Sequence, residues 1–339
     1  MTELTYPDIE AAAARIAGRV RPVTVASAQP GNLAEAASPT AAAWSSGPAE
    51  DPSASGLLFA LEFMQYTGTF KARGAQNFIR AHLEEGTFPE AGVTIASGGN
   101  AGLACAWAAR AAGVPATVFL PASAPEVKVD RLRSYGAEVV LTGSEYAEAA
   151  AACRDFVDSS GALASHAYDH PLIAAGAGTL MTEILTQVPD LDTVVVSVGG
   201  GGLFAGVATA ATYHGVRTVA VEPENCRALD AALEAGEPVD VTVDSVAADS
   251  LGARRATPLA LDAARSDLVT SVLVSDEAII GARQHLWDDH RLAVEHAAAT
   301  ALAGISGADE SKTTGGYVPA AGEKVCVVLC GANTGLGDL

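Results

Sequence analysis

The chain has 339 residues, of which 49% are hydrophobic and only 5% aromatic, so it can bury a large core built from Ala, Val and Leu. Its formal net charge of −20 at pH 7 argues against nucleic acid or an anionic membrane as the main partner. The cysteines are Cys105, Cys153, Cys226, Cys326 and Cys330. They do not have the spacing of a metal site, and they suit the reducing cytoplasm.

The N-terminal segment predicts one helix and then a loop. Residues 7–19 have an amphipathic pattern, with Asp8 and Glu10 in the first turn. Residues 27–56 are rich in Ala, Ser, Pro and Gly without periodicity, which predicts a loop and carries no functional signal. We find no basic segment followed by an apolar one at the start, and therefore expect no secretion signal.

From residue 57 onward, short apolar runs alternate with helix-like segments. The predicted strands are 57–63, 93–96, 116–120, 138–141, 163–166, 193–198, 218–221 and 324–329. The predicted helices are 71–85, 101–112, 125–135, 145–159, 176–187, 203–214, 276–288 and 294–303. Strands that alternate with crossover helices predict an α/β fold with parallel sheets and helices on both faces.

Residues 193–214 are uncharged and long enough to resemble a membrane span. Four consecutive glycines interrupt the segment, and the apolar residues on either side fit a buried strand followed by a helix. We therefore expect no membrane partner.

Lys71 stands out among the charged residues. The chain carries four lysines, and Lys71 alone lies among Gly, Thr and Phe, directly after an apolar run, whereas Lys128, Lys312 and Lys324 have polar surroundings. An amine that loses hydration has a lowered pKa and becomes a usable nucleophile and base. A Schiff-base lysine needs both properties. The alternative is a lysine at a strand end that points to solvent.

Two glycine clusters fall where predicted strands lead into helices, the place at which ligands bind to parallel sheets. The first is Ser97-Gly98-Gly99-Asn100-Ala101-Gly102, whose backbone N–H groups could bind a substrate carboxylate. The alternative is an ordinary turn in which Ser97 or Asn100 caps the helix.

The second cluster is the run Gly199–Gly202, followed by Leu203. Close approach of the backbone to a phosphate explains such a run. The same residues, with Glu222 twenty positions past Gly202, also match a relaxed dinucleotide fingerprint, so NAD is a second candidate ligand. A plain strand-to-helix turn is the third alternative.

Two further groups of residues could bear on function. Cys330-Gly331-Ala332-Asn333 follows the last apolar strand, and Cys330 is either a small buried hydrophobe or a thiol that faces a ring nitrogen. Asp288-Asp289-His290 and Glu295-His296 form the densest acidic and His cluster. Their spacing is not that of a zinc motif, so we interpret them as a solvated face.

Taken together and in this order, Thr67 to Ala75, Ser97 to Ala104, the four glycines and the terminal Cys-Gly-Ala-Asn resemble the fold type II pyridoxal-phosphate enzymes. Among them, the serine/threonine dehydratases (ammonia-lyases) are the most similar, from about Leu57 to the C-terminus. The resemblance implies two open, twisted, mostly parallel sheets in the tryptophan-synthase-β-like arrangement. It also implies a homodimer, a large domain of residues 1–84 and 166–339, and a small mobile domain of residues 85–165.

The resemblance assigns roles to individual residues. Lys71 would hold pyridoxal 5′-phosphate as a Schiff base and act in catalysis. The other cofactor contacts would be Phe70 on the ring, Asn100 at the ring hydroxyl, Cys330 at the ring nitrogen, and Gly199, Gly200, Gly201, Gly202 and Leu203 around the phosphate. The substrate carboxylate would be held by Ser97, Gly98, Gly99, Asn100 and Ala101.

The implied reaction is β-elimination of L-serine or L-threonine to a 2-keto acid and ammonia. Elimination from a bulkier hydroxy amino acid or a diamino acid, replacement at the same carbon, and a non-catalytic carrier of the cofactor remain alternatives. Related racemases carry Ser where this chain has Gly98, which favours dehydration here. Glu222 resembles a cation-binding acid of the family, but the second acid of the divalent version falls at Ala228, so a monovalent cation is the candidate.

Overall fold

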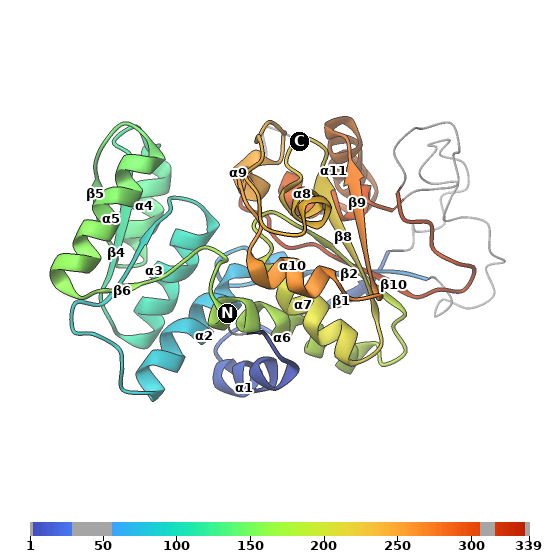
Figure 1. Cartoon of the computed structure of the whole chain (residues 1–339), viewed down its shortest axis with the longest axis horizontal. Coiled ribbons are helices and arrows are strands. Elements are labelled where there is room, and N and C mark those ends of the chain that lie inside the picture. The colour runs from blue at the N-terminus through green and yellow to red at the C-terminus, as the bar shows by residue number, and fades with distance from the viewer. Residues whose placement is uncertain (1–2, 29–55, 306–315, 336–339) are drawn as a thin grey trace.

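The computed structural model describes residues 3–28, 56–305 and 316–335, and it contains two β-sheets with helices around them (Figure 1). The larger sheet has the strand order β1 (Val25–Ser27), β2 (Leu57–Ala60), β10 (Val325–Val328), β7 (Thr193–Ser197), β8 (Arg217–Pro223) and β9 (Val269–Val274). The smaller sheet has the order β5 (Glu138–Leu141), β4 (Ala116–Leu120), β3 (Val93–Ala96) and β6 (Leu163–Ala164).

Every strand pair is parallel except β1 with β2. The helices are α1 (Tyr6–Ile16), α2 (Lys71–Glu84), α3 (Asn100–Ala112), α4 (Glu126–Ser134), α5 (Tyr146–Ser160), α6 (Pro171–Gln187), α7 (Gly202–Tyr213), α8 (Ala228–Ala235), α9 (Ala248–Leu251), α10 (Pro258–Ala264), α11 (Asp276–His290) and α12 (His296–Ala303). The predicted fold class, two mostly parallel sheets flanked by helices, is confirmed.

The division into domains stays a proposal. All four strands of the smaller sheet, and helices α3, α4 and α5, come from residues 93–164, whereas the larger sheet draws its strands from both sides of this span. We propose residues 85–165 as the small domain, and residues 1–84 with 166–339 as the large one.

The sequence patterns missed elements at the edges of the larger sheet. β9 is an edge strand in which only two of six residues are buried, so it lacks the continuous apolar run of a central strand. The sequence predicted a start at residue 176 for α6, but the helix begins at Pro171, where His170 accepts the backbone N–H of Leu172. Position 176 lies inside this helix and is occupied by glycine, because a side chain there would collide with the backbone of α2 at Arg73.

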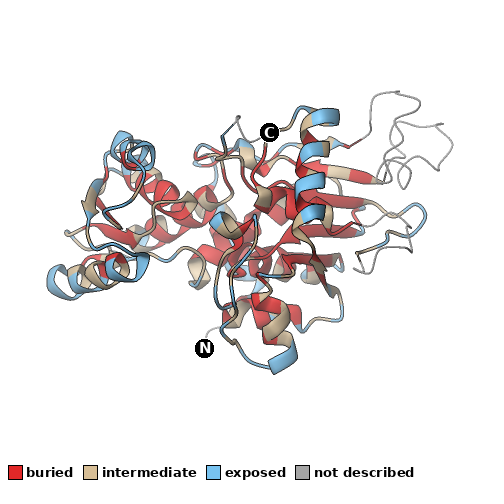
Figure 2. Ribbon diagram, turned by 90° about the horizontal axis from the view of Figure 1, so that it is seen from above, coloured by how far each residue is buried: buried red, intermediate tan, exposed pale blue. Residues whose placement is uncertain are grey.

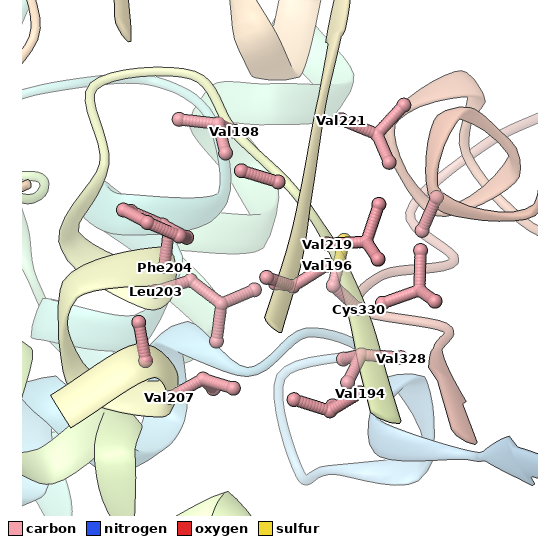
Figure 3. Close-up of a cluster of buried hydrophobic side chains, with 14 of the residues drawn as sticks. Val194, Val196, Val198, Leu203, Phe204, Val207, Val219, Val221, Val328 and Cys330 are labelled. Atoms are coloured by element: carbon pink, nitrogen blue, oxygen red, sulfur yellow. The ribbon is translucent and has the colours of Figure 1, made fainter. Parts of the chain in front are cut away.

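The core of the larger sheet is made of valines. Val194, Val196, Val219 and Val328 lie in one cluster with Phe204 and other residues of α7 (Figure 3). In Figure 2, where buried residues are red, they run through the strands of the larger sheet. The predicted strand and helix within residues 193–214 are thus confirmed as β7 and α7, and no helix among the described residues has the length and apolarity that crossing a membrane requires.

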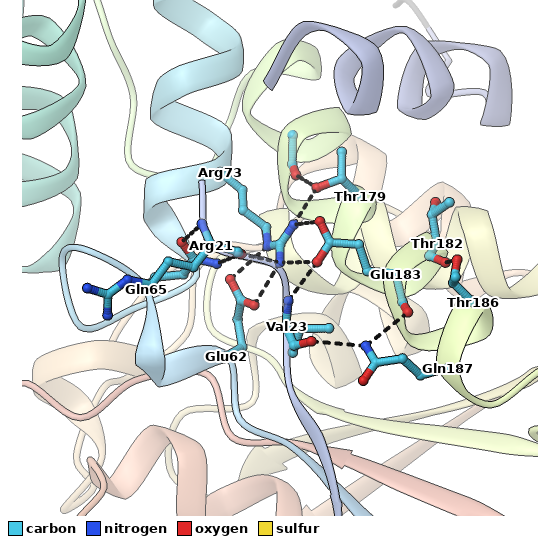
Figure 4. A network of polar contacts seen from close by, with 11 residues as sticks. Arg21, Val23, Glu62, Gln65, Arg73, Thr179, Thr182, Glu183, Thr186 and Gln187 are labelled. Carbon is cyan, nitrogen blue, oxygen red and sulfur yellow. Dashed lines mark hydrogen bonds and ion pairs between the residues drawn. The ribbon is translucent and has the colours of Figure 1, made fainter. Parts of the chain in front are cut away.

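A buried ionic network lies two residues from Lys71, on the first turn of α2 (Figure 4). Arg73 has no exposed surface, and its guanidinium donates to Glu62 (2.7 and 3.0 Å) and Glu183 (2.7 and 2.8 Å). Burial raises the pKa of Glu62, while the Arg73 charge opposes that rise. The network joins α2 to α6, because Glu183 lies on α6 and also accepts the backbone N–H of Val23.

We expect Arg73→Ala to cost about 3–5 kcal/mol of the free energy of unfolding, because it leaves the Glu62 carboxylate fully buried without its cation. Urea denaturation followed by circular dichroism measures this change. The control is Arg255→Ala, which breaks an exposed pair with Asp240 and should cost at most about 1 kcal/mol. Equal losses in the two variants would contradict a structural role for the network.

Candidate functional site

Lys71 is the first residue of α2, and the turn before it is joined to the segment after β10. The backbone N–H of Phe70 donates to the carbonyl of Cys330 (3.0 Å), and that of Ala332 donates to Gly68 (2.9 Å). Gly68 has a φ of +77°, which glycine adopts without strain. These bonds bring Lys71 and Cys330, 259 residues apart in the chain, to one place.

The Lys71 amine is held among backbone and aromatic groups. It donates to the carbonyl of Ala167 at 3.0 Å and lies 4.6 Å from the ring centre of Phe70. Burial lowers the pKa of the Lys71 amine to about 8, and negative charge on Cys330 or Glu295 opposes this shift. Burial also raises the pKa of the Cys330 thiol to about 12, so the thiol is neutral when Lys71 titrates, and the charge that counts is on Glu295.

The glycine run forms a tight cradle at the start of α7. Gly201 is the N-cap with a φ of +94°, and no side chain caps the helix. A Cβ on Gly200 would lie 2.2 Å from the ring of Tyr168, and one on Gly201 would lie 2.3 Å from Ala260. Side chains are thus excluded, and the N–H groups of the first turn are available to an anion. Tyr168 follows directly on the residue that accepts the Lys71 hydrogen bond, which places the cradle beside the amine.

The first glycine cluster, Ser97 to Gly102, leads from β3 into α3. Gly99 is the N-cap of α3 and no side chain caps the helix, so the alternative of a cap by Ser97 or Asn100 is wrong. A Cβ on Gly102 would lie 1.8 Å from the carbonyl oxygen of Ser97, so the loop is too tight for any other residue. The cluster therefore presents a second uncapped helix N-terminus, of the kind that binds carboxylates.

Glu295 lies inside the site, and its assignment to a solvated face is wrong. Only 7% of its surface is exposed. Its carboxylate accepts the side-chain amide of Asn100 (3.0 Å to both oxygens), the backbone N–H of Asn333 (2.8 Å) and the hydroxyl of Ser250 (3.1 Å). Glu295 is the N-cap of α12, and its donors come from three separate segments of the chain. No local sequence pattern reveals that these segments meet. The neighbouring Asp288 is exposed, as expected.

His166 also borders the site, although no motif in the sequence surrounds this histidine. It lines a cavity together with Lys71 and Cys105. Its Nδ1 accepts the backbone N–H groups of Asp169 (2.8 Å) and Tyr168 (3.3 Å), which leaves Nε2 as the protonated nitrogen of the ring. Burial lowers the pKa of His166, so this tautomer is the neutral form at pH 7.

Glu222 is fully buried at the end of β8. Its two oxygens accept the backbone N–H groups of Leu229 and Asp230, each at 2.8 Å, in the first turn of α8. Burial raises the pKa of this carboxyl to about 8. A ribose-binding acid needs free oxygens, so this geometry does not favour the NAD alternative. Among the described residues, no group of His, Cys, Asp and Glu has the arrangement of a metal site.

Comparison with known proteins places this geometry in a family. Residues 12–331 match the family model described as "Pyridoxal-phosphate dependent enzyme". An L-threonine ammonia-lyase of Geobacter sulfurreducens is 39% identical over 251 residues, which cover 74% of this chain and 62% of the relative. The chain thus spans less than two thirds of that protein's length.

Two further proteins are similar over more of their length. A human protein named serine dehydratase-like is 36% identical over 278 residues, covering 80% of this chain and 83% of the relative. The structure of maize serine racemase superposes with a TM-score of 0.82 at 29% identity, covering 99% of this chain and 95% of that one. The two architectures are therefore the same.

We expect the Lys71 amine to gain reactivity near pH 8, because it holds its proton below this pH and loses it above. Competitive acetylation with acetic anhydride between pH 6 and 11, read by mass spectrometry, gives the profile for each lysine. Lys128, with 44% of its side chain exposed, is the reference in the same sample. Superimposable profiles for the two lysines would rule out a special environment for Lys71.

Proposed function

Because the chain belongs to the family of pyridoxal-phosphate dependent enzymes, we propose that it is an ammonia-lyase that converts L-serine, L-threonine or both to a 2-keto acid and ammonia. The observation that carries this proposal is the Lys71 amine, whose pKa is lowered to about 8 beside two uncapped, glycine-lined helix N-termini. Relatives named threonine ammonia-lyase and serine dehydratase-like support the choice of substrate.

The residues present fit the cofactor. The amides of Gly199 to Gly202 and Leu203 would hold its phosphate, because side chains are excluded from this cradle and no cap competes. Phe70 would pack on the ring, and Asn100 and Cys330 would face its hydroxyl and its nitrogen. When bound, the cofactor supplies the electron sink that makes loss of a proton and a β-substituent feasible.

Lys71 is the proposed base. An amine with a pKa of about 8 is deprotonated in an appreciable fraction at neutral pH and remains basic enough to take a proton from the α-carbon of the substrate. The N-terminus of α3, with Ser97 to Ala101, would hold the substrate carboxylate and so orient that carbon toward the amine.

Cys330 would favour elimination over other outcomes. Its thiol is buried, lies 3.7 Å from the Ser197 hydroxyl, and is neutral at physiological pH because burial raises its pKa to about 12. A neutral partner gives the ring nitrogen no charge, so negative charge on the α-carbon is poorly stabilised and prompt loss of the β-hydroxyl is favoured.

Racemisation is the second candidate function, and the fold shared with maize serine racemase supports it. It needs an acid on the face of the substrate opposite Lys71. Gly98 has no side chain to supply one, and a Cβ there would lie 2.7 Å from the Leu120 side chain. We therefore propose the lyase activity as the main one.

Three finer points complete the proposal. We propose a homodimer. We also propose a cytoplasmic location, which fits the buried cysteines without disulfides among the described residues. We keep Glu222 as the candidate ligand of a monovalent cation. Its oxygens already accept two backbone N–H groups, so a cation would have to use their remaining lone pairs.

Purified protein with pyridoxal phosphate should be yellow and should release ammonia and a keto acid from L-serine or L-threonine. Lys71→Ala should abolish both the colour and the product, because no other described residue of the site supplies a comparable amine. Absorbance and a keto-acid assay over a panel of β-substituted amino acids, including hydroxy and diamino acids, measure this. A colourless wild type that pyridoxal phosphate cannot reconstitute would reject the proposal.

Gly98→Ser should introduce racemase activity toward L-serine, because the new hydroxyl can return a proton to the opposite face of the α-carbon. Chiral chromatography of the unreacted substrate detects the D-isomer. The matched control is Gly98→Ala, which makes the same contact with Leu120 without a hydroxyl. Equal D-serine from the two variants would show that the hydroxyl is not the missing element.

A further inference from the structure

The Asn100 amide is held at both of its ends. Its Nδ2 donates to Glu295 at 3.0 Å, and its Oδ1 accepts from the side chain of Asn333 at 2.8 Å. Asn333 is fixed in turn, because its Nδ2 also donates to the carbonyl of Thr67 (2.8 Å) and its backbone N–H donates to Glu295 (2.8 Å). With these partners, the amide of Asn100 cannot rotate by half a turn without placing donor against donor.

One N–H of the Asn100 amide stays uncommitted. Nδ2 lies 3.0 Å from both Glu295 oxygens, and these two oxygens subtend a much smaller angle at the nitrogen than its two N–H bonds do. A single N–H therefore points between the oxygens, and the second N–H points elsewhere. Because the first bond ends on a carboxylate, it is charge-assisted and polarises the amide further.

The surroundings are built to keep this carboxylate in place. A Cβ on Gly331 would lie 2.7 Å from Oε2 of Glu295, so glycine makes room for it. The backbone N–H of Glu295 donates to the Gly331 carbonyl at 3.0 Å, and the hydroxyl of Ser250 donates to Oε2. Glu295 lies near enough to Lys71 and Cys330 for its charge to raise the pKa values of both groups.

We propose that Glu295 is a positioning residue that orients the Asn100 amide, so that its second N–H is presented to the ring hydroxyl of the cofactor. This inference rests on the proposed function, because it assumes that the site binds pyridoxal phosphate. Glu295 is the N-cap of α12, which packs against β7 and β8 of the larger sheet, and it acts through Asn100, the first residue of α3 after the smaller sheet. The contact therefore also links the two sheets at the site.

The test is a double-mutant cycle on the affinity for pyridoxal phosphate, measured by absorbance titration without any amino acid. Glu295→Ala should weaken binding by at least about tenfold, the size of a lost charge-assisted hydrogen bond. Asn100→Ala should weaken it to a similar degree. The double variant should be no weaker than Asn100→Ala alone, because the carboxylate then has nothing left to orient.

Glu295→Gln distinguishes the orienting role of this side chain from the effect of its negative charge. Its amide oxygen can still accept from Asn100 and its nitrogen can donate to the Ser250 hydroxyl, but that nitrogen replaces an oxygen 3.0 Å from Asn100 Nδ2, so Glu295→Gln should restore part of the affinity lost in Glu295→Ala. Removing the charge should also lower the pKa of Lys71 further, which the acetylation profile reads without cofactor. A Gln variant as weak as the Ala variant would assign the effect to charge rather than to orientation and would overturn the proposal.

Glu323→Ala is the matched control, because Glu323 is a buried carboxylate that accepts from Tyr317 and the Ala320 N–H at a distance from the site. It should lower stability to urea and leave cofactor affinity unchanged. Independent effects of Glu295→Ala and Asn100→Ala, no effect of Glu295→Ala, or an equal effect of Glu323→Ala would each overturn the proposal. Since no amino acid is present, failure to find a substrate affects the proposed function alone.

Discussion

The site depends on the pairing of two chain segments, the turn before α2 and the residues after β10. β2 and β10 are neighbours in the larger sheet and run parallel, so their carboxyl ends emerge at the same edge. The N–H of Phe70 and the N–H of Ala332 then bind the opposite segment. An amine near the N-terminus and a thiol near the C-terminus become neighbours because the sheet places their strands side by side.

Few full charges act in this site, and burial controls those of Lys71 and Cys330. The Lys71 amine is easily deprotonated, the Cys330 thiol stays neutral, and Glu295 carries the negative charge between them. Positive potential for anionic ligands comes from the first turns of α3 and α7, which no side chain caps. In this way a chain of net charge −20 can hold a phosphate and a carboxylate without a cluster of basic side chains.

The structural and the chemical parts of α2 lie next to each other. Lys71 performs the proposed chemistry, and Arg73, two residues later, anchors the same turn to Glu62 and to Glu183 on α6. A buried ion pair contributes little net stability, but it is costly to break, so it holds the turn in one position. This rigidity is what a nucleophile needs, because small displacements of the reacting amine carry large losses in rate.

In our proposal, a lyase and a racemase with this fold differ very little in structure. The fold of maize serine racemase covers almost the whole chain, and the residue at position 98 carries the proposed difference. A missing hydroxyl on one face of the substrate leaves Lys71 as the only proposed proton carrier at the α-carbon. We thus propose that a single side chain sets the reaction class, while the scaffold is shared.

The α/β class, the central strands and the two glycine clusters could be predicted from the residues alone, because each depends on local chemistry. Buried parallel strands need continuous apolar runs, and tight turns at helix N-termini need glycine. Lys71 was also evident, since it is a rare lysine in an apolar setting. The edge strand β9 was missed because it is only partly buried and lacks a continuous apolar run. The start of α6 was predicted too late because Gly176, which packs against α2, resembles a residue at a helix end.

Polar groups from distant segments meet only in the folded chain, so their contacts could not be predicted. Glu295 reads as a surface acid in the sequence, yet its three donors, Asn100, Asn333 and Ser250, converge on it from distant segments. Glu222 shows the opposite case. Its sequence position suggests an acid that binds a ligand, but its two oxygens accept backbone N–H groups of α8. A carboxylate's role depends on the donors that surround it, and these are brought together by strand order and helix packing, which the local pattern of residues does not encode.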